Sequence, residues 1–306
     1  MTTKRLLIIG GTGFIGRNLV IKSIELGYSV TVLSLSNPTR ESKLNEVFYI
    51  QCDINNYYDL QQKLTENSFD YVINLGGYVD HSSFLDGGID VMEAHFLGVL
   101  NILKIIDWKI LKRFVQIGSS DEYGNSVAPQ NEKMPGSAIS PYSFGKLAVT
   151  QLLEMLYRTE NFPMVVIRLF LVYGPGQNSE RFFPQIINGC LSGDNFPVSM
   201  GEQLRDFCYI DDITRGILLT LEKNEAIGEV INLGSGNPLS IKQAIKIIQK
   251  TVGKGNPDFG KYSYRVDENM ELYADITKAN KILNWQPNVD INHGLNKTIS
   301  YFKEQS

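Results

Sequence analysis

Tyr142 and Lys146 lie four residues apart in a segment that is typical of a helix, so their side chains share one helical face. A phenol has an ordinary pKa near ~10 and is a poor base at neutral pH, but a neighbouring ammonium stabilises its phenolate form. Such a pair is suited to proton transfer. Because the chain holds 15 tyrosines, the pair gains its meaning from its place among the other motifs.

Glycines at positions 10, 13 and 16 form a second chemical signal, a GxxGxxG spacing directly after the apolar run Arg5–Ile9. In such a strand-turn-helix unit the first glycine permits the tight turn, the second lets the backbone approach a pyrophosphate, and the third allows close helix packing. The helix N-terminus offers unpaired N–H groups to the phosphates. We therefore expect Gly10, Gly13 and Gly16 to bind a dinucleotide; a glycine-rich turn without a ligand is the alternative.

The residues after the next two strands bear on which dinucleotide binds. An acid commonly ends the second strand and holds the adenosine ribose, but this chain has Ser34 there. No basic residue directly follows that strand, which favours NAD, although Arg40 or Lys43 could reach a 2′-phosphate, so NADP stays an alternative. Asp53 and Ile54 follow the third strand, where the aspartate either accepts a hydrogen bond from the adenine amino group or caps a turn.

Short apolar runs alternate with helical patterns over the first half of the chain, which is typical of repeated βαβ units. The expected strands are Arg5–Ile9, Val30–Leu33, Val47–Gln51, Tyr71–Leu75, Phe114–Ile117 and Met164–Arg168, with another at Glu229–Leu233. The expected helices are Ile15–Leu26, Tyr58–Glu66, Ile89–Asp107, Tyr142–Thr159 and Ser240–Thr251. This order predicts an α/β fold with a doubly wound, Rossmann-type parallel sheet.

The sequence pattern changes in the second half of the chain, where longer loops rich in Gly, Pro and Asn are expected from about Gly174 onward. We expect a dinucleotide-binding domain over residues 1–173 and a smaller, loop-rich substrate domain over residues 174–306. The strand region 229–236 is expected to return to the main sheet.

Composition excludes several classes of protein. The chain has 306 residues, with 29 basic and 33 acidic residues and a net charge of −4, which argues against binding to nucleic acid or to an anionic membrane. The three cysteines and three histidines are scattered, so we expect neither a disulfide framework nor a metal site. No apolar stretch approaches the ~18 residues of a membrane span, and the first apolar run is too short for a signal peptide. We therefore expect a cytoplasmic protein.

Taken together, these motifs resemble the extended short-chain dehydrogenase/reductase family, the NAD-dependent epimerases and dehydratases that modify nucleotide sugars. The pair Tyr142 and Lys146 follows the glycine turn by four strands, and Ser119 precedes it at the end of a strand. The resemblance covers nearly the whole chain, and the further matching segments are residues 168–175, 205–207, 211–212 and 232–236. The resemblance implies that the cofactor site also includes Phe14, Ile15, Leu75 and Gly76.

The resemblance also implies roles for the proton-transfer residues. Tyr142 would remove a proton from a sugar hydroxyl as hydride leaves the same carbon, or return it in reduction. Lys146 would lower the pKa of Tyr142, together with the positive nicotinamide ring, and would hold the nicotinamide ribose. Ser119 would hydrogen-bond the reacting oxygen, with a strand-end cap as its alternative role.

The residues after Ser119 bear on which reaction follows the family's shared oxidation or reduction at C4 of the sugar. The family's 4,6-dehydratases carry an acidic pair or a Ser-Glu pair there, since elimination needs a base for the C5 proton and an acid for the leaving hydroxyl. This chain has Ser120 and Asp121, and Asp121 is one methylene shorter than the usual Glu. Glu122 replaces a common aliphatic residue. These changes weaken the dehydratase interpretation and leave Asp121 as a candidate catalytic residue.

Several polar residues are candidates for contact with the nucleotide sugar. Leu75-Gly76-Gly77 replaces the family's usual Leu-Ala-Ala, and we expect the glycines to leave room for a differently shaped substrate or for a shifted loop. Two arginines match the placement of family arginines that bind the diphosphate, because a guanidinium group can donate two parallel hydrogen bonds to phosphate oxygens. A structural role for these arginines, such as a salt bridge, is the alternative. The candidate substrate residues are Asp80, His81, Ser120, Asn178, Arg181 and the two arginines, Arg205 and Arg265.

We expect an enzyme that acts at C4 of a nucleotide sugar as a 4-dehydrogenase or 4-ketoreductase. A 4-epimerase is the first alternative and a 4,6-dehydratase the second. A dinucleotide-binding sensor or scaffold without turnover is disfavoured, because it has no physical need for the serine, tyrosine and lysine together. By analogy with relatives, the helices Ile89–Asp107 and Tyr142–Thr159 are expected to form the interface of a homodimer.

Overall fold

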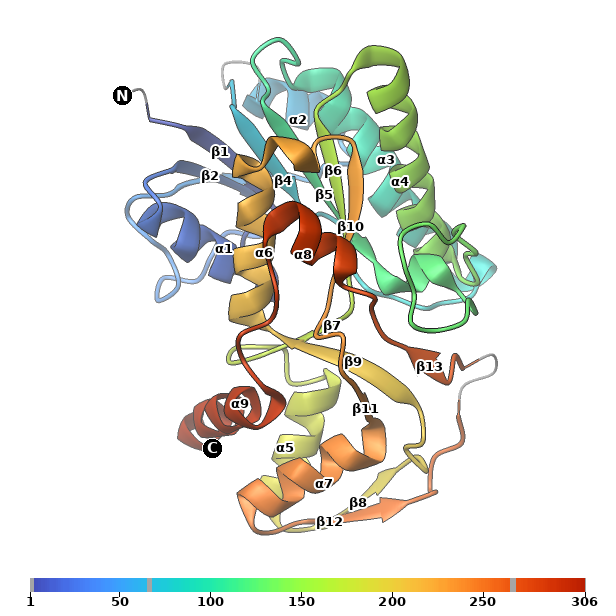
Figure 1. The fold of residues 1–306 in the computed structure, drawn as a ribbon. Helices are drawn as coiled ribbons and strands as arrows, with labels where there is room; N and C mark the ends of the chain where they lie inside the picture. The colour runs from blue at the N-terminus through green and yellow to red at the C-terminus, as the bar shows by residue number, and fades with distance from the viewer. Residues whose placement is uncertain (1–2, 65–67, 265–267, 306) are drawn as a thin grey trace.

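A seven-stranded parallel sheet is the largest element of the computed structural model, which describes residues 3–64, 68–264 and 268–305 (Figure 1). The strands are β1 (Arg5–Ile9), β2 (Ser29–Ser34), β3 (Phe48–Gln51), β4 (Tyr71–Asn74), β5 (Arg113–Ser119), β6 (Met164–Leu169) and β10 (Glu229–Leu233). Their order is β10-β6-β5-β4-β1-β2-β3, and each neighbouring pair is parallel. Because the order reverses between β1 and β4, the predicted doubly wound sheet is confirmed.

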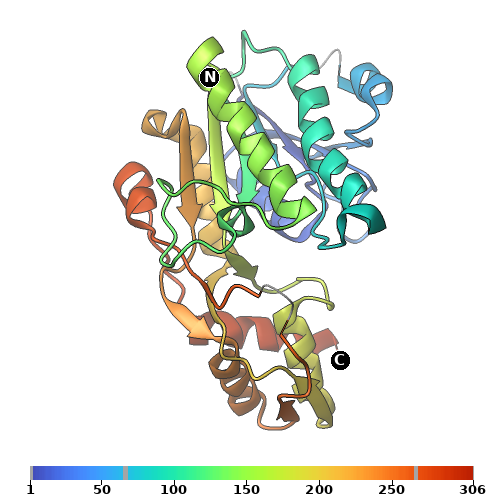
Figure 2. The same ribbon diagram turned by 90° about the vertical axis from the view of Figure 1, so that its right-hand side faces the viewer.

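Helices cover both faces of this sheet, as Figure 1 and Figure 2 show from two directions. One layer consists of α1 (Phe14–Glu25), α6 (Ile210–Glu222) and α8 (Thr277–Leu283), and the other of α2 (Tyr57–Leu64), α3 (Ile89–Ile105) and α4 (Pro141–Glu160). Side chains alternate along a strand, so Leu6 and Ile8 of β1 join one core cluster and Leu7 and Ile9 join the other. This two-sided burial explains why the strands appear in the sequence as continuous apolar runs.

The predicted elements of the first half agree with the structure to within a few residues at their ends. Strand β5 is longer than predicted and extends to Ser119, which places that serine at the last strand position. The predicted helix Tyr58–Glu66 corresponds to α2, and its predicted end at residues 65–66 lies outside the described residues.

A second lobe lies beyond the carboxyl ends of the sheet strands, in the lower part of Figure 1. Its helices are α5 (Phe182–Ser192), α7 (Ile241–Val252) and α9 (Ile291–Gln305), which pack around one apolar core. Its short strands are β7 (Leu171–Tyr173), β8 (Asn195–Val198), β9 (Leu204–Tyr209), β11 (Pro238–Ser240), β12 (Asn256–Phe259) and β13 (Glu271–Leu272). The second lobe therefore also contains helices, α5 and α9, that the sequence analysis did not predict.

The chain passes between the two lobes more than once. Strand β10 pairs with β6 in the main sheet, and the helices α6 and α8 also return to that sheet. Ile213 and Ile217 of α6 and Leu283 of α8 belong to the same core cluster as Leu6 and Ile8. The sequence analysis expected only the strand region to return, so the residues after 173 contribute more to the sheet lobe than expected.

Across the described ranges, no helix is both long enough and apolar enough to span a membrane.

Candidate active site

A cleft of about 1670 Å³ runs from the carboxyl ends of the sheet strands to the second lobe. It is lined by Gly10 after β1 and Leu75 after β4, and it reaches Arg205 and Phe207 of β9. Doubly wound sheets bind ligands at this point, outside the strands that flank the order reversal. The volume exceeds the ~300–1000 Å³ of a usual small-molecule pocket, so the cleft has room for two ligands.

The glycine turn fits the pyrophosphate of a dinucleotide. Gly10 has a φ of +78°, which favours glycine, and a Cβ there would lie 3.1 Å from the Leu75 carbonyl oxygen. A Cβ on Gly16 would overlap the Gly10 carbonyl oxygen, so α1 packs directly on the turn. By contrast, a Cβ on Gly13 would meet only that oxygen, at 3.4 Å, and Gly13 provides no side-chain cap for the first N–H groups of α1. Those N–H groups are therefore available to phosphate oxygens.

The predicted cofactor residues lie together along this side of the cleft. Ser34 accepts a hydrogen bond from the Thr12 N–H at 3.3 Å, which ties the end of β2 to the glycine turn. Asp53 accepts the Asn55 N–H at 2.9 Å and so forms the turn that the sequence left as one alternative, although it also lines the cleft. The lining residues include Gly10, Gly13, Phe14, Ile15, Gly16, Ser34, Asp53, Ile54, Leu75 and Gly76.

The cationic residues that line the cleft lie away from the adenosine end. Within the described ranges they are Lys146, Arg181 and Arg205, whereas Arg40 and Lys43 do not line it. A 2′-phosphate at the end of β2 would therefore have no lining cation as a partner there, which favours NAD over NADP.

Helix α4 carries Tyr142 and Lys146 into the cleft at its first two turns. Ser140 caps its N-terminus by accepting the Ser143 N–H at 3.1 Å, and Pro141 occupies the first helical position, where its missing N–H is tolerated. The Lys146 ammonium donates to the Ile117 carbonyl at 2.8 Å and lies 6.0 Å from the centre of the Tyr142 ring. The start of α4 therefore fixes both side chains against the end of β5.

The structure brings Ser119, Tyr142 and Lys146 together. Burial is the main reason that the pKa of Tyr142 is above its ordinary value, and the charge of Asp121 raises that pKa further. A hydrogen bond with Ser119 and the charge of Arg181 act in the opposite direction. Burial lowers the pKa of Lys146 to about 8, against the opposing charge of Glu122. The protein's own groups thus hold a neutral phenol beside a lysine that is still largely an ammonium at neutral pH.

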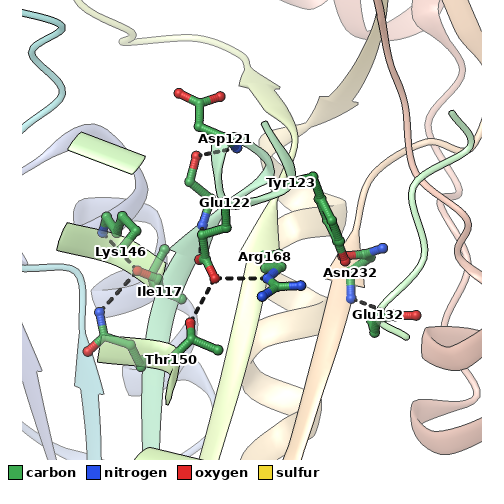
Figure 3. A network of polar contacts seen from close by, with 11 residues as sticks. Ile117, Asp121, Glu122, Tyr123, Glu132, Lys146, Thr150, Arg168 and Asn232 are labelled. Carbon is green, nitrogen blue, oxygen red and sulfur yellow. Dashed lines mark hydrogen bonds and ion pairs between the residues drawn. The ribbon is translucent and has the colours of Figure 1, made fainter. Parts of the chain in front are cut away.

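The two acidic residues after Ser120 point in different directions, as Figure 3 shows. Asp121 lines the cleft, and its N–H donates to the Ser119 hydroxyl oxygen at 3.1 Å. Glu122 is fully buried beneath the site and forms an ion pair with Arg168, with 2.9 Å between the guanidinium Nε and the carboxylate. Only Asp121 of this acidic pair is therefore placed to act on a substrate.

Two histidine rings flank the Tyr142 ring, and the sequence analysis gave one of them, His95, no role. Ring centres are 5.2 Å apart for His95 and Tyr142 and 5.5 Å for His81 and Tyr142, both edge to face. The His95 Nε2–H donates to the Tyr78 carbonyl at 2.9 Å, and burial lowers the pKa of His95 to about 3. His95 lies on the inward face of a strongly apolar helix, so its sequence signal is that of a core position.

His95 also changes the interpretation of the glycines after β4. A Cβ on Gly77 would overlap the His95 ring, and a Cβ on Gly76 would lie 2.8 Å from the Asn74 side-chain oxygen. The room that we expected there for a substrate is therefore filled from inside the protein.

The structure separates the candidate substrate residues into three groups. His81, Ser120, Asn178, Arg181 and Arg205 line the cleft. Asp80 instead accepts the Ser82 N–H at 2.7 Å in a turn and is not among the described lining residues. Arg265 lies outside the described residues.

Arg205 has the salt bridge that the sequence left as an alternative. Its guanidinium forms an ion pair with Glu268, which also lines the cleft, and donates to the Leu204 carbonyl at 2.9 Å. Over the described part of the chain, no cluster of His, Cys, Asp and Glu could hold a metal ion.

Comparisons with known proteins match this chain to one family. The model of the NAD-dependent epimerase/dehydratase family matches residues 6–234. A UDP-glucuronate 4-epimerase of Thermodesulfobacterium geofontis is 29% identical, over 97% of this chain and 96% of that protein. UDP-glucuronic acid decarboxylase 1 of Xenopus tropicalis is 29% identical, over 99% of this chain and 73% of that protein. The solved structure of a UDP-glucuronic acid 4-epimerase from Bacillus cereus, in complex with UDP-glucuronic acid and NAD, is 28% identical and covers 99% of this chain and 100% of that one, with a TM-score of 0.87.

Proposed function

The chain belongs to the NAD-dependent epimerase/dehydratase family, and we propose that it uses NAD to oxidise or reduce C4 of a nucleotide sugar, as a 4-dehydrogenase or 4-ketoreductase. The observation that carries this proposal is the convergence of Ser119, Tyr142 and Lys146 in the cleft that also contains the glycine turn. A serine and a tyrosine at one reacting oxygen suffice for proton transfer.

In this proposal NAD, when bound, supplies the hydride acceptor or donor and a positive nicotinamide ring that favours the phenolate. The Ser119 hydroxyl holds the reacting oxygen by a hydrogen bond. The Tyr142 oxygen takes the proton from the sugar hydroxyl in oxidation and returns it in reduction. Lys146, held by the Ile117 carbonyl, orients the ribose and keeps a positive charge close to Tyr142.

A dehydratase is less well supported because elimination needs two further groups, an acid and a base. Asp121 can serve as one of them, but Glu122 is occupied by its ion pair with Arg168. Ser120 and Asp121 both line the cleft at the positions of the family's Ser-Glu pair, but the Asp121 side chain is one methylene shorter than the usual glutamate. One proton-transfer centre with one additional carboxylate fits oxidation or reduction better than elimination.

A 4-epimerase is the second candidate, and the names of the relatives favour it. Two of the proteins compared above are 4-epimerases of a UDP-sugar. An epimerase uses the same Ser119, Tyr142 and Lys146. It must also allow the keto sugar to rotate in the site, so that the hydride returns to its opposite face.

Product analysis separates these outcomes. The enzyme is incubated with a panel of nucleotide sugars and NAD, and with nucleotide 4-keto sugars and NADH, while NADH absorbance is followed and products are identified by NMR. A stoichiometric change in NADH supports the dehydrogenase or ketoreductase, and a C4 epimer without net change in NADH supports the epimerase. If neither appears with any member of the panel, the proposal is wrong.

We also propose that the protein forms a homodimer through α3 and α4 and that it is located in the cytoplasm, as the sequence analysis expected. The two helices pack side by side on one face of the sheet and carry exposed apolar side chains. Leu97 of α3 is 37% exposed, and Phe144 and Met155 of α4 are 55% and 40% exposed. Apolar side chains on two neighbouring helices are suited to packing against a second copy.

A further inference from the structure

Glu122 is a fully buried carboxylate with three hydrogen-bond donors around it (Figure 3). One oxygen, Oε1, accepts the backbone N–H of Ser119 at 2.9 Å. The other, Oε2, accepts the Thr150 hydroxyl at 2.8 Å and Arg168 Nε at 2.9 Å. A buried carboxylate is stable only when paired and hydrogen-bonded, and Glu122 meets both conditions.

The three donors come from three elements, and two of these, β5 and α4, hold the reacting groups. Ser119 ends β5 and supplies the hydroxyl of the site. Thr150 lies on α4 four residues after Lys146, so the two side chains share one face of the helix. Arg168 lies on β6, the strand next to β5. The Glu122 carboxylate therefore links the serine strand to the helix of the tyrosine and the lysine.

The surrounding residues are shaped to receive this carboxylate. A Cβ on Gly118 would overlap Glu122 Oε1, so the glycine makes room for the oxygen. The Arg168 guanidinium lies 4.5 Å from the centre of the Tyr123 ring, and the Tyr123 hydroxyl donates to Asn232 at 2.8 Å. Arg168 is thus held in place from its other side, which fixes its pairing with Glu122.

Charge gives Glu122 a second effect on the site. Lys146 and Arg168 are both buried cations, and Glu122 is the carboxylate that faces them. The other titratable groups that face these cations are Tyr142 and His95 beside Lys146 and Tyr123 beside Arg168. Asp121 acts on Tyr142. His95 is neutral near pH 7 because burial lowers its pKa to about 3. The charge of Glu122 therefore opposes the tendency of burial to deprotonate Lys146.

We propose that Glu122 is a positioning residue for the reaction: its buried carboxylate fixes Ser119 relative to the helix of Tyr142 and Lys146 and places a negative charge beneath the site. This inference rests on the proposed function of the three residues. Glu122 touches no substrate, because it is fully buried and is not among the cleft-lining residues that the structure describes.

The test compares Glu122→Gln with a matched change elsewhere, Asp212→Asn. Asp212 is also a buried carboxylate that accepts two backbone N–H groups, those of Asn288 and Val289, and pairs with Arg215, but it does not line the cleft. Lys146 is followed by NMR of lysine labelled with carbon-13 at Cε in the protein without substrate, and its signal is assigned from the Lys146→Arg spectrum. We expect Glu122→Gln to lower the pKa of Lys146 by about one unit, a tenfold fall in the ratio of ammonium to amine, and Asp212→Asn to leave it unchanged.

A milder variant keeps the proposal testable if Glu122→Gln does not fold. Thr150→Val removes one hydrogen bond to Glu122 without changing side-chain shape or charge. We expect kcat to fall about threefold to tenfold with KM for the sugar unchanged, and Thr150→Ser to restore it, since serine keeps the hydroxyl. If Glu122 served folding alone, Glu122→Gln and Thr150→Val would both lower the stability of the protein but would leave kcat per folded molecule unchanged.

The proposal is overturned if Lys146 titrates alike in wild type and Glu122→Gln, or if Thr150→Val turns over substrate like the wild type. The NMR titration needs no substrate, so its outcome is independent of which reaction the enzyme catalyses. Failure of the proposed function would appear instead as full activity of Tyr142→Phe.

Discussion

Tyr142 is the residue on which the proposed chemistry depends, and its surroundings explain why it needs help to act as a base. Burial and the charge of Asp121 raise its pKa, while the bond with Ser119 lowers it. The Lys146 ammonium, which the sequence analysis expected to lower the pKa of the phenol, is hydrogen-bonded to the Ile117 carbonyl and lies 6.0 Å from the centre of the Tyr142 ring. The protein alone therefore keeps Tyr142 protonated, which suits proton donation in a reduction.

Replacement of Tyr142 by phenylalanine removes the proton-transfer group and little else. We expect kcat to fall by about 100- to 10,000-fold, the usual contribution of general acid–base catalysis, with NAD binding retained. Steady-state kinetics and calorimetric titration of NAD measure the two quantities. Tyr28→Phe, a similar change at a buried tyrosine that does not line the cleft as described, serves as the control and should keep full activity.

His95 gives the protein a stability that depends on pH. Its pKa is about 3 in the folded protein and near ~6.5 when unfolded, so the unfolded chain binds a proton more readily. The stabilising contribution is fully present above pH 6.5 and is lost as the pH falls towards 3. Between pH 6.5 and 5 the wild type should lose about 2 kcal/mol more of its unfolding free energy than His95→Phe does. Urea unfolding at pH 6.5 and pH 5 measures the unfolding free energy of each protein. Equal losses in the wild type and in His95→Phe would contradict the lowered pKa of His95.

At the scale of elements, the sequence predicts the strands of the sheet well because each is a short, continuous apolar run buried on both faces. Helix α5 was missed although Phe183, Ile186, Ile187 and Cys190 follow a helical spacing, because Pro184 and Gly189 interrupt the pattern. The buried network of Glu122 could not be predicted, since Arg168 reaches it from another strand 46 positions away. Long-range contacts of this kind leave no local signal in one sequence.

The turn between β1 and α1 provides a prediction at this scale. A methyl group on Gly13, in the turn that we propose for the pyrophosphate, would meet only the Gly10 carbonyl oxygen, at 3.4 Å, whereas one on Gly16 would overlap that oxygen. We therefore expect Gly13→Ala to fold with an unchanged melting temperature and to bind NAD at least about tenfold more weakly, a loss of ~1.4 kcal/mol. Gly16→Ala should instead lower the melting temperature. Unchanged NAD affinity in Gly13→Ala would show that the turn does not hold the dinucleotide.

At the scale of the whole molecule, the two lobes contribute different residues to the cleft. The sheet lobe carries the glycine turn and the reacting residues, whereas β9 and the loop before α5 bring Arg205, Asn178 and Arg181 from the other side. Because α6, β10 and α8 return to the sheet, several chain segments connect the lobes. The helices α3 and α4, which form the proposed dimer interface, lie side by side on one face of the sheet lobe.

We expect light scattering at micromolar concentration to give twice the chain mass of 34.4 kDa. Leu97→Glu places a charge in the proposed interface and should produce a monomer. Leu26→Glu, at the end of α1 and 59% exposed, is the matched control and should remain dimeric. A monomeric wild type would refute the proposed interface.

Transfer of hydrogen at C4 tests the central proposal most directly. Nucleotide sugars that carry deuterium at C4, with several bases and sugars in the panel, are incubated with the protein and NAD, and C4 is examined by NMR. We predict that deuterium leaves C4 of at least one sugar, appearing in NADH or returning to C4 with inverted configuration, and that Tyr142→Phe nearly abolishes this loss. Deuterium that stays in place throughout the panel with the wild type, or leaves equally fast with Tyr142→Phe, would contradict the account.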